Sequence, residues 1–168
     1  DIRVNRVTQA PVVDGELEPV WFEKGTKLSA FFLRGRETPA NRTEAYVACD
    51  DAYLYLAVRA FVPDVANVKG SRLEQDNLRV HSEDCIEILL DTAFGRERYH
   101  PFTVNAAGAK TDMAPGRILA WNGEWDAVAR IHTETRSIDY EVRIPVALFT
   151  GLSLAGRWGL NIGRNDTA

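Results

Sequence analysis

The stretch TEAYVACDDAYLYLAVRAFV, residues 43–62, decides the fold class of this chain. Apolar and polar side chains alternate on both sides of Asp50 and Asp51, and this period of two is typical of β-strands with one buried face. Adjacent aspartates favour a turn, because a short carboxylate bonds nearby backbone N–H groups. The stretch therefore predicts an antiparallel hairpin that turns at residues 50–52.

The same period recurs along the rest of the chain, which predicts more strands and few helices. Two further antiparallel pairs are expected, 85–92 with 99–108 and 125–135 with 137–145. Single strands are expected at residues 2–7, 26–33 and 157–166. Short helical turns are expected at residues 16–25, at 145–149 and near 71–76 within a long polar loop, residues 64–80. About eight to ten short strands predict an all-β fold, an antiparallel β-sandwich of jelly-roll type in one domain over residues 1–168.

Composition and charge exclude several classes of protein. The 168 residues are 45% hydrophobic and carry a net charge of −4, so the basic excess typical of nucleic-acid binding is absent. No apolar run reaches the roughly 18 residues of a membrane helix, so we expect no membrane span. The chain starts without Met or a signal peptide, and we expect a processed chain or an excised domain. Two cysteines, Cys49 and Cys85, are too few for a disulfide framework, although one bridge between them stays open.

Polar side chains gather on one side of the strand pair 85–105. Every second side chain from Ile86 to Leu90 is apolar and predicted to face the core, whereas Glu87 points to the opposite face. Thr103 and Asn105 on the neighbouring strand are expected to share that face. Sugars need such a mixture of groups, because each hydroxyl both donates and accepts hydrogen bonds. An ordinary solvated sheet surface is the alternative interpretation.

The order of several motifs resembles carbohydrate-binding module family 9 and its β-sandwich relatives. The matching pieces run from about residue 11 to residue 166 and are VVDGELEPVW, EAYVACDDAYLYLAVRAFVPD, EDCIEILLDT, YHPFTVNAAG, DYEVRIPVALF and GRWGLNIGRND. The resemblance implies a β-sandwich that binds carbohydrate without catalysing a reaction. It also implies a secreted or periplasmic location, and a catalytic, polysaccharide-degrading domain in the same polypeptide.

The resemblance implies roles for single residues as well. It places the family's ligand-contacting Glu at Glu87 and a hydrogen-bonding strand position at Thr103. His81 stands where the family has one of two sugar-gripping Trp rings, and the second Trp falls beyond Asp166. Some members carry structural calcium, which prefers oxygen ligands, and Asp64 and Asp166 are the candidate ligands. A turn or cap role is the alternative for each of these two aspartates.

Other side chains could complete a sugar site. Trp121 and Trp125 lie in a predicted loop, where a ring could stack on the apolar face of a sugar. Packing of both rings against the sandwich is the alternative. Arg164 and Asn165, in the last predicted strand, would help to orient hydroxyl groups.

Three other functions stay open. A glycosidase needs paired carboxylates, but Glu87 and Asp91 would lie about 13 Å apart along a strand, beyond the ~5–9.5 Å such enzymes use. A haem-binding domain would use Met113 with a histidine, and the three candidates are His81, His100 and His132. A structural or protein-interaction sandwich is the main alternative. The sequence as a whole predicts a carbohydrate-binding domain that is not itself an enzyme.

Overall fold

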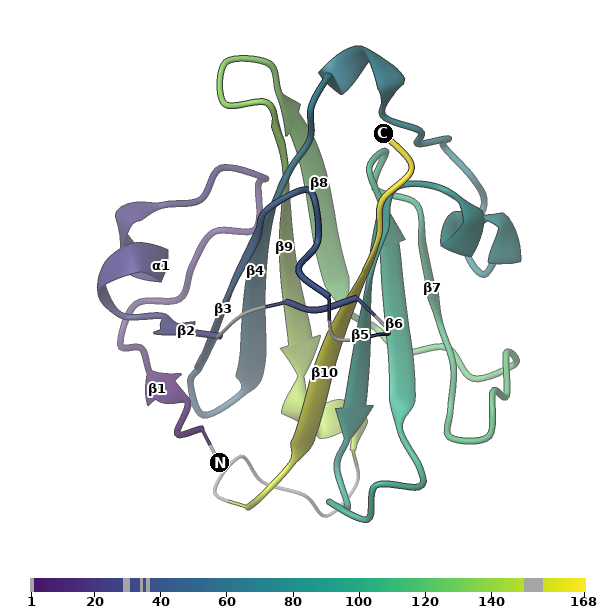
Figure 1. Ribbon diagram of the computed structural model, residues 1–168. Helices are drawn as coiled ribbons and strands as arrows, with labels where there is room; N and C mark the ends of the chain where they lie inside the picture. Colours follow the sequence, from purple (N-terminus) through teal and green to yellow (C-terminus); the bar gives the residue numbers. More distant parts are fainter. Residues whose placement is uncertain (1, 29–30, 34, 36, 150–155) are drawn as a thin grey trace.

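Two β-sheets pack face to face in the computed structural model, which describes residues 2–28, 31–33, 35, 37–149 and 156–168 (Figure 1). The first, sheet A, has the strand order β1-β3-β4-β9-β8, and β2 also pairs with β3. Its strands are β1 Asn5–Arg6, β2 Thr26–Lys27, β3 Thr43–Cys49, β4 Tyr53–Phe61, β8 Asp126–His132 and β9 Ser137–Pro145. All pairs in this sheet are antiparallel except β1 with β3.

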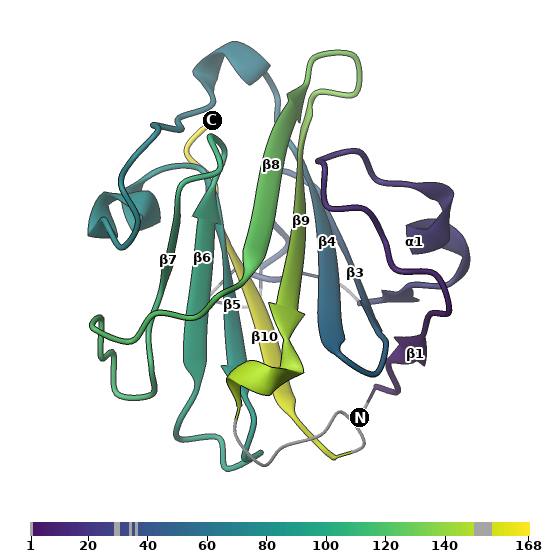
Figure 2. The same cartoon turned by 180° about the vertical axis from the view of Figure 1, so that it is seen from behind.

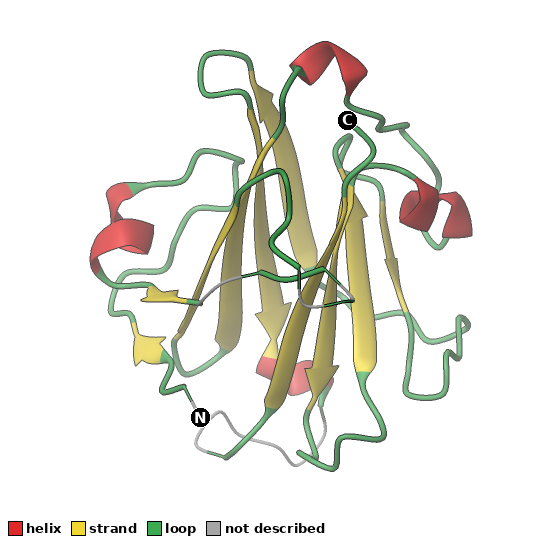
Figure 3. Cartoon of the chain, in the orientation of Figure 1, coloured by secondary structure: helices red, strands yellow, loops and turns green. Residues whose placement is uncertain are grey.

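Sheet B is fully antiparallel, with the order β10-β5-β6-β7. Its strands are β5 Cys85–Asp91, β6 His100–Asn105, β7 Lys110–Asp112 and β10 Gly159–Asn165. The helical elements are short and lie outside the two sheets (Figure 3): α1 Pro19–Glu23 and the 3₁₀ turns η1 Val65–Asn67, η2 Leu78–Ser82 and η3 Val146–Leu148. None of the helices in the described part of the chain has the length and apolar character to cross a bilayer.

The predicted antiparallel β-sandwich is confirmed, and so is the hairpin turn between β3 and β4. Some short elements differ from the prediction. β1 has only two residues, Asn5–Arg6, and β2 only Thr26–Lys27; of the strand predicted at 26–33, residues 29 and 30 lie outside the described residues. β7 was not predicted, and the 3₁₀ turn in the long loop lies at 78–82 instead of near 71–76.

The core lies between the sheets and follows the period of two. Ile86, Ile88 and Leu90 of β5 are at most 1% exposed and pack with apolar side chains of β4 and β9, as the alternation predicted. Burying each such side chain contributes about 1.5–3 kcal/mol to folding. Cys49 and Cys85 are both buried and both free, so the bridge that the sequence left open is absent.

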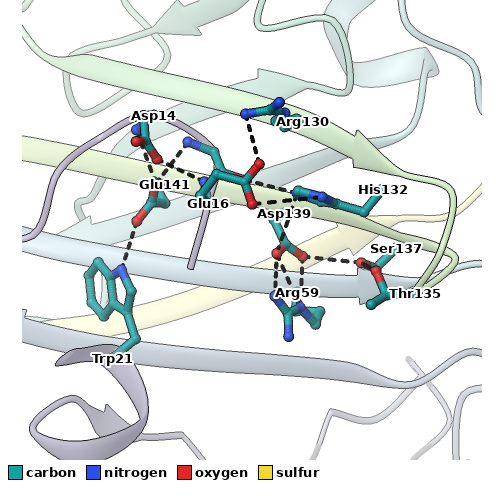
Figure 4. Close-up of polar contacts among 11 residues, drawn as sticks. Asp14, Glu16, Trp21, Arg59, Arg130, His132, Thr135, Ser137, Asp139 and Glu141 are labelled. Carbon is teal, nitrogen blue, oxygen red and sulfur yellow. Dashed lines mark hydrogen bonds and ion pairs between the residues drawn. The ribbon is translucent and has the colours of Figure 1, made fainter. Parts of the chain in front are cut away.

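The N-terminal segment covers the outer face of sheet A and is fastened there by Glu141 of β9. The carboxylate of Glu141, 0% exposed, accepts from Trp21 Nε1 at 2.7 Å and from the backbone N–H groups of Gly15 at 2.8 Å and Asp14 at 3.1 Å (Figure 4). Burial raises the pKa of the Glu141 carboxyl, and these hydrogen bonds counter part of that rise. Gly15 has φ +86°, and a Cβ there would lie 2.7 Å from Cβ of Arg130, so the segment needs glycine at this position.

Arg164 joins the two sheets at the side where β3 and β10 face each other. Its guanidinium donates to the carbonyl of Phe61 at 2.8 Å, to Thr43 Oγ1 at 3.1 Å and to the carbonyl of Arg42 at 3.2 Å. The side chain is only 8% exposed and also pairs with Asp166 at 3.1 Å. Because β10 belongs to sheet B and the acceptors belong to β3, β4 and the residue before β3, this side chain holds the sandwich closed.

Candidate functional site

The outer face of sheet B carries a row of polar positions across four strands. Gly163 of β10, Glu87 of β5, Thr103 of β6 and Thr111 of β7 are direct cross-strand neighbours. The side chain of Glu87 is 39% exposed. A Cβ added at Gly163 would reach only the backbone oxygen and Cβ of Glu87, at 3.9 and 4.0 Å. The glycine therefore places no side chain beside Glu87.

His81 of η2 lies beside Glu87. Its Nδ1 is 3.9 Å from Glu87 Oε1, and its side chain is 33% exposed. The backbone of η2 is held at this place by Asn165, whose Nδ2 donates to the carbonyls of His81 at 3.2 Å and Glu83 at 2.9 Å. The structure thus brings His81 and Glu87 together at the surface, with Asn165 as the residue that positions His81.

Glu87 differs from the other carboxylates of residues 83–91. Glu83 accepts from Ser71 N and Asn105 Nδ2, Asp84 from Lys69 N and Thr167, and Asp91 from Ala93 N and Arg96 N. Those three side chains are at most 7% exposed. Within this stretch Glu87 is therefore the carboxylate that can accept hydrogen bonds from a ligand.

Thr103 lies next to Glu87 but is 0% exposed, which differs from the expected open face. Residues of η2 lie against β5, β6 and β7, and Val80 at its centre is also 0% exposed. Thr103 Oγ1 has no hydrogen-bond partner among the described residues. The segment that the sequence indicated as a loop therefore covers half of the predicted polar face.

Asn105 was expected to contact a ligand, but its side chain is 0% exposed and already fully bonded. Its Nδ2 donates to Ser71 O at 2.8 Å and Glu83 Oε2 at 2.6 Å, and its Oδ1 accepts from the N–H groups of Ala107 and Ala109. An amide group has two donors and two acceptor positions, and all four are in use. Asn105 therefore holds the segment from Ser71 to Glu83 against sheet B and presents no free group to a ligand.

Trp125 and Trp121 lie away from Glu87. Trp125 is 2% exposed and donates from Nε1 to Asp112 at 3.1 Å, so the predicted role as a sugar platform conflicts with its burial. Trp121 is half-buried and contacts His100 and Phe102, at ring-centroid distances of 4.9 and 6.0 Å. Phe102 points to the core, on the opposite side of sheet B. The two tryptophans therefore do not join the Glu87 face.

The predicted calcium ligands have other partners. Asp64 accepts from the N–H group of Ala66 at 2.9 Å and caps η1, and Asp166 accepts from Asn41 at 2.8 Å beside the guanidinium of Arg164. In the described ranges no group of three or more His, Cys, Asp or Glu could hold a metal ion. Because Ca²⁺ also accepts backbone carbonyl and water ligands, calcium binding at Asp64 and Asp166 stays a prediction.

The fold is shared with solved carbohydrate-binding proteins. No protein-family model and no curated protein matches the chain. A carbohydrate-binding module of family 9 from Caldicellulosiruptor kristjanssonii in complex with cellotriose is 19% identical, with a TM-score of 0.68 over 98% of this chain and 77% of that one. A structure of a family 9 module from the same organism in complex with glucose is 17% identical, with a TM-score of 0.66 over 96% of this chain and 78% of that one.

A third structure has the same fold. It is a protein from Bacteroides uniformis with a provisional carbohydrate-binding description, 17% identical, with a TM-score of 0.69 over 96% of this chain and 81% of that one. The resemblance seen in the order of the motifs is thus confirmed for the fold over nearly the whole chain.

Proposed function

We propose that this chain is a non-catalytic carbohydrate-binding domain that binds sugar on the outer face of sheet B. The observation that carries the proposal is Glu87, a partly exposed carboxylate with His81 on one side and the backbone of Gly163 on another. The fold that it shares with family 9 modules solved in complex with cellotriose and with glucose supports the same function. The other carboxylates in residues 83–91 already accept hydrogen bonds from the protein itself, which argues against acid–base catalysis at this face.

In this proposal Glu87 accepts hydrogen bonds from two neighbouring hydroxyl groups of a sugar. Hydrogen bonds to a charged group contribute about 1.5–3 kcal/mol each, more than neutral ones. The ring of His81 provides a flat edge against the sugar. Asn161, exposed on β10 and paired with Leu89, adds an amide within the same face. With so few contacts the affinity for a single sugar unit is modest.

We also propose where the protein is located and which kind of domain accompanies it. A domain of this kind would act outside the cytoplasm, secreted or periplasmic, beside a catalytic domain that degrades polysaccharide. The support is the shared fold and the sugars bound in the two family 9 structures that have it. Fractionation of cells that produce the full-length protein would test the location.

The test of the binding site begins with a glycan array that includes glucose and cello-oligosaccharides. Each hit is then titrated by calorimetry against the wild-type chain and Glu87→Gln. We expect Glu87→Gln to bind at least about tenfold more weakly, because one charge-assisted contact is lost. The matched control is Glu134→Gln, an exposed carboxylate in the turn between β8 and β9, which should bind normally.

Two results would contradict the proposal. If no glycan binds, carbohydrate binding is wrong for this domain. If glycans bind and Glu87→Gln binds them as tightly as wild type, the site lies elsewhere. Unchanged thermal unfolding of both variants shows that any loss of binding is local.

A further inference from the structure

A ladder of alternating charges crosses the outer face of sheet A. Glu44 of β3 lies opposite Arg59 of β4, Arg59 opposite Asp139 of β9, and Asp139 opposite Arg130 of β8. Figure 4 shows the inner part of this row, where Arg59 donates to both oxygens of Asp139, at distances from 2.5 to 3.1 Å. Opposite charges on neighbouring strands stabilise a sheet. In the inner part of the ladder, each charged side chain therefore has a neighbour of opposite charge.

At the end of the ladder next to β2, positive charges outnumber negative charges among the described residues. Lys27 and Arg42 both contact the same oxygen of Glu44, Lys27 at 3.0 Å. The side chains of Lys27 and Arg42 are 56% and 67% exposed, whereas that of Glu44 is only 12% exposed. A lysine has three donors and an arginine five, more than one carboxylate can accept. Two exposed cations therefore share one shielded anion.

Aromatic rings lie beneath the cations of this end. Three cation–ring contacts are present: Lys27 over Tyr46 at 5.6 Å, Arg42 over Phe61 at 5.4 Å and Arg59 over Phe22 at 5.8 Å. The ring of Phe22 packs edge-on against Tyr46 at 5.4 Å, and Phe22 is 48% exposed. The rings restrict where the cations lie. Phe22 also offers an apolar surface beside them.

We propose that the Lys27–Arg42 patch, defined by these two cations with Glu44, Tyr46 and Phe22, is a second binding site, for an anionic glycan. A carboxylate or sulfate group on the sugar accepts hydrogen bonds from Lys27 and Arg42 together. The C–H face of the sugar packs on the apolar ring of Phe22. An acidic peptide would gain less from this apolar surface. The patch lies on sheet A and the Glu87 site on sheet B, so the two sites are separate and the proposals are independent.

Binding of four probes to the whole chain tests this proposal. The anionic sugars are tetragalacturonate and a sulfated dextran oligomer, the neutral sugar is cellotetraose, and the polyanion without sugar is polyglutamate. We expect at least one anionic sugar to bind, more weakly as salt is raised because the contact is ionic. Lys27→Gln and Arg42→Gln should each weaken it about threefold to tenfold, and the double variant more. Which of the two anionic sugars binds identifies the anion.

A matched control lies on the same face of sheet A. Arg143 of β9 lies over the ring of Tyr53 at 5.0 Å and pairs with Asp126 alone, so its charge is balanced. Arg143→Gln should leave anionic glycan binding unchanged. The proposal is overturned if neither anionic sugar binds at low salt, if polyglutamate binds equally well, or if Arg143→Gln weakens binding as much as Arg42→Gln.

Discussion

At the scale of single residues, Glu141 and Glu16 are two carboxylates on the same face of sheet A with different energetic roles. Glu141 is buried and accepts from three N–H groups, with no cation among these partners. Glu16 is 53% exposed and pairs with Arg130 at 2.8 Å. A buried donor without a partner costs more than an exposed ion pair contributes, so Glu141 contributes more than Glu16 to fastening the N-terminal segment.

We predict that Glu141→Ala lowers the free energy of unfolding by about 2–5 kcal/mol, because it leaves Trp21 Nε1 and two backbone N–H groups buried without acceptors. Glu16→Ala should cost less than about 1 kcal/mol. Urea unfolding of both variants measures the difference. Equal losses would show that Glu141 contributes no more than a surface ion pair.

Alternation predicted which way single side chains point, but it could not predict what covers them. Glu87 and Thr103 share a sheet face as expected, yet Glu87 is open and Thr103 is under η2. The difference depends on η2 and the polar loop before it, whose sequence shows no hydrophobic period from which its position could be predicted. The burial of Trp125, the alternative left open, could not be predicted for a related reason, because its partner Asp112 lies in a strand, β7, too short to show a pattern.

At the scale of elements, the segment from residue 69 to η2 owes its position to polar side chains of sheet B. Asn105 of β6 binds Ser71 O and the side chain of Glu83, and Ser71 N also binds Glu83. Although burial alone would raise the pKa of Glu83, the hydrogen bonds from Ser71 and Asn105 hold it below its usual value. The covered half of the outer face thus depends on a buried polar network.

We predict that Asn105→Ala frees this segment while most of the sandwich stays folded. Hydrogen exchange measured by mass spectrometry should rise selectively in residues 69–83, because their anchors are lost. Stability should fall by about 1–3 kcal/mol. The control is Asn122→Ala, which removes one exposed hydrogen bond, to Gln75 at 3.2 Å in the same loop. An even rise over the whole chain would argue against a local role.

At the scale of the whole molecule, the sequence predicted the hairpins but not how they assemble. Pairs such as β3 with β4, or β8 with β9, are visible because a turn joins two alternating stretches. Nothing local indicates that β4 pairs with β9, or that β10 returns beside β5. Those contacts are set by which apolar faces can be buried together, a property of the complete chain.

We predict that Arg164→Met lowers the melting temperature by roughly 5–15 °C, because two part-buried acceptors of sheet A, Phe61 O and Thr43 Oγ1, lose their donor. Arg6→Met is the control, since Arg6 forms an exposed ion pair with Asp51 and should change the melting temperature little. Differential scanning calorimetry measures both. Similar shifts for the two variants would show that Arg164 does not join the sheets.

The pairing of β4 with β9 also affects how the chain folds. Residues 53–61 cannot form this pairing before residues 137–145 reach them, and β5, β6, β7 and β8 lie between the two strands in the sequence (Figure 2). Long-range pairing slows folding, and in such sandwiches it commonly takes milliseconds to seconds. During that time one edge of β4 is open and can pair with another chain. Refolding yield should therefore fall as protein concentration rises, even though the finished sandwich has this strand in its centre.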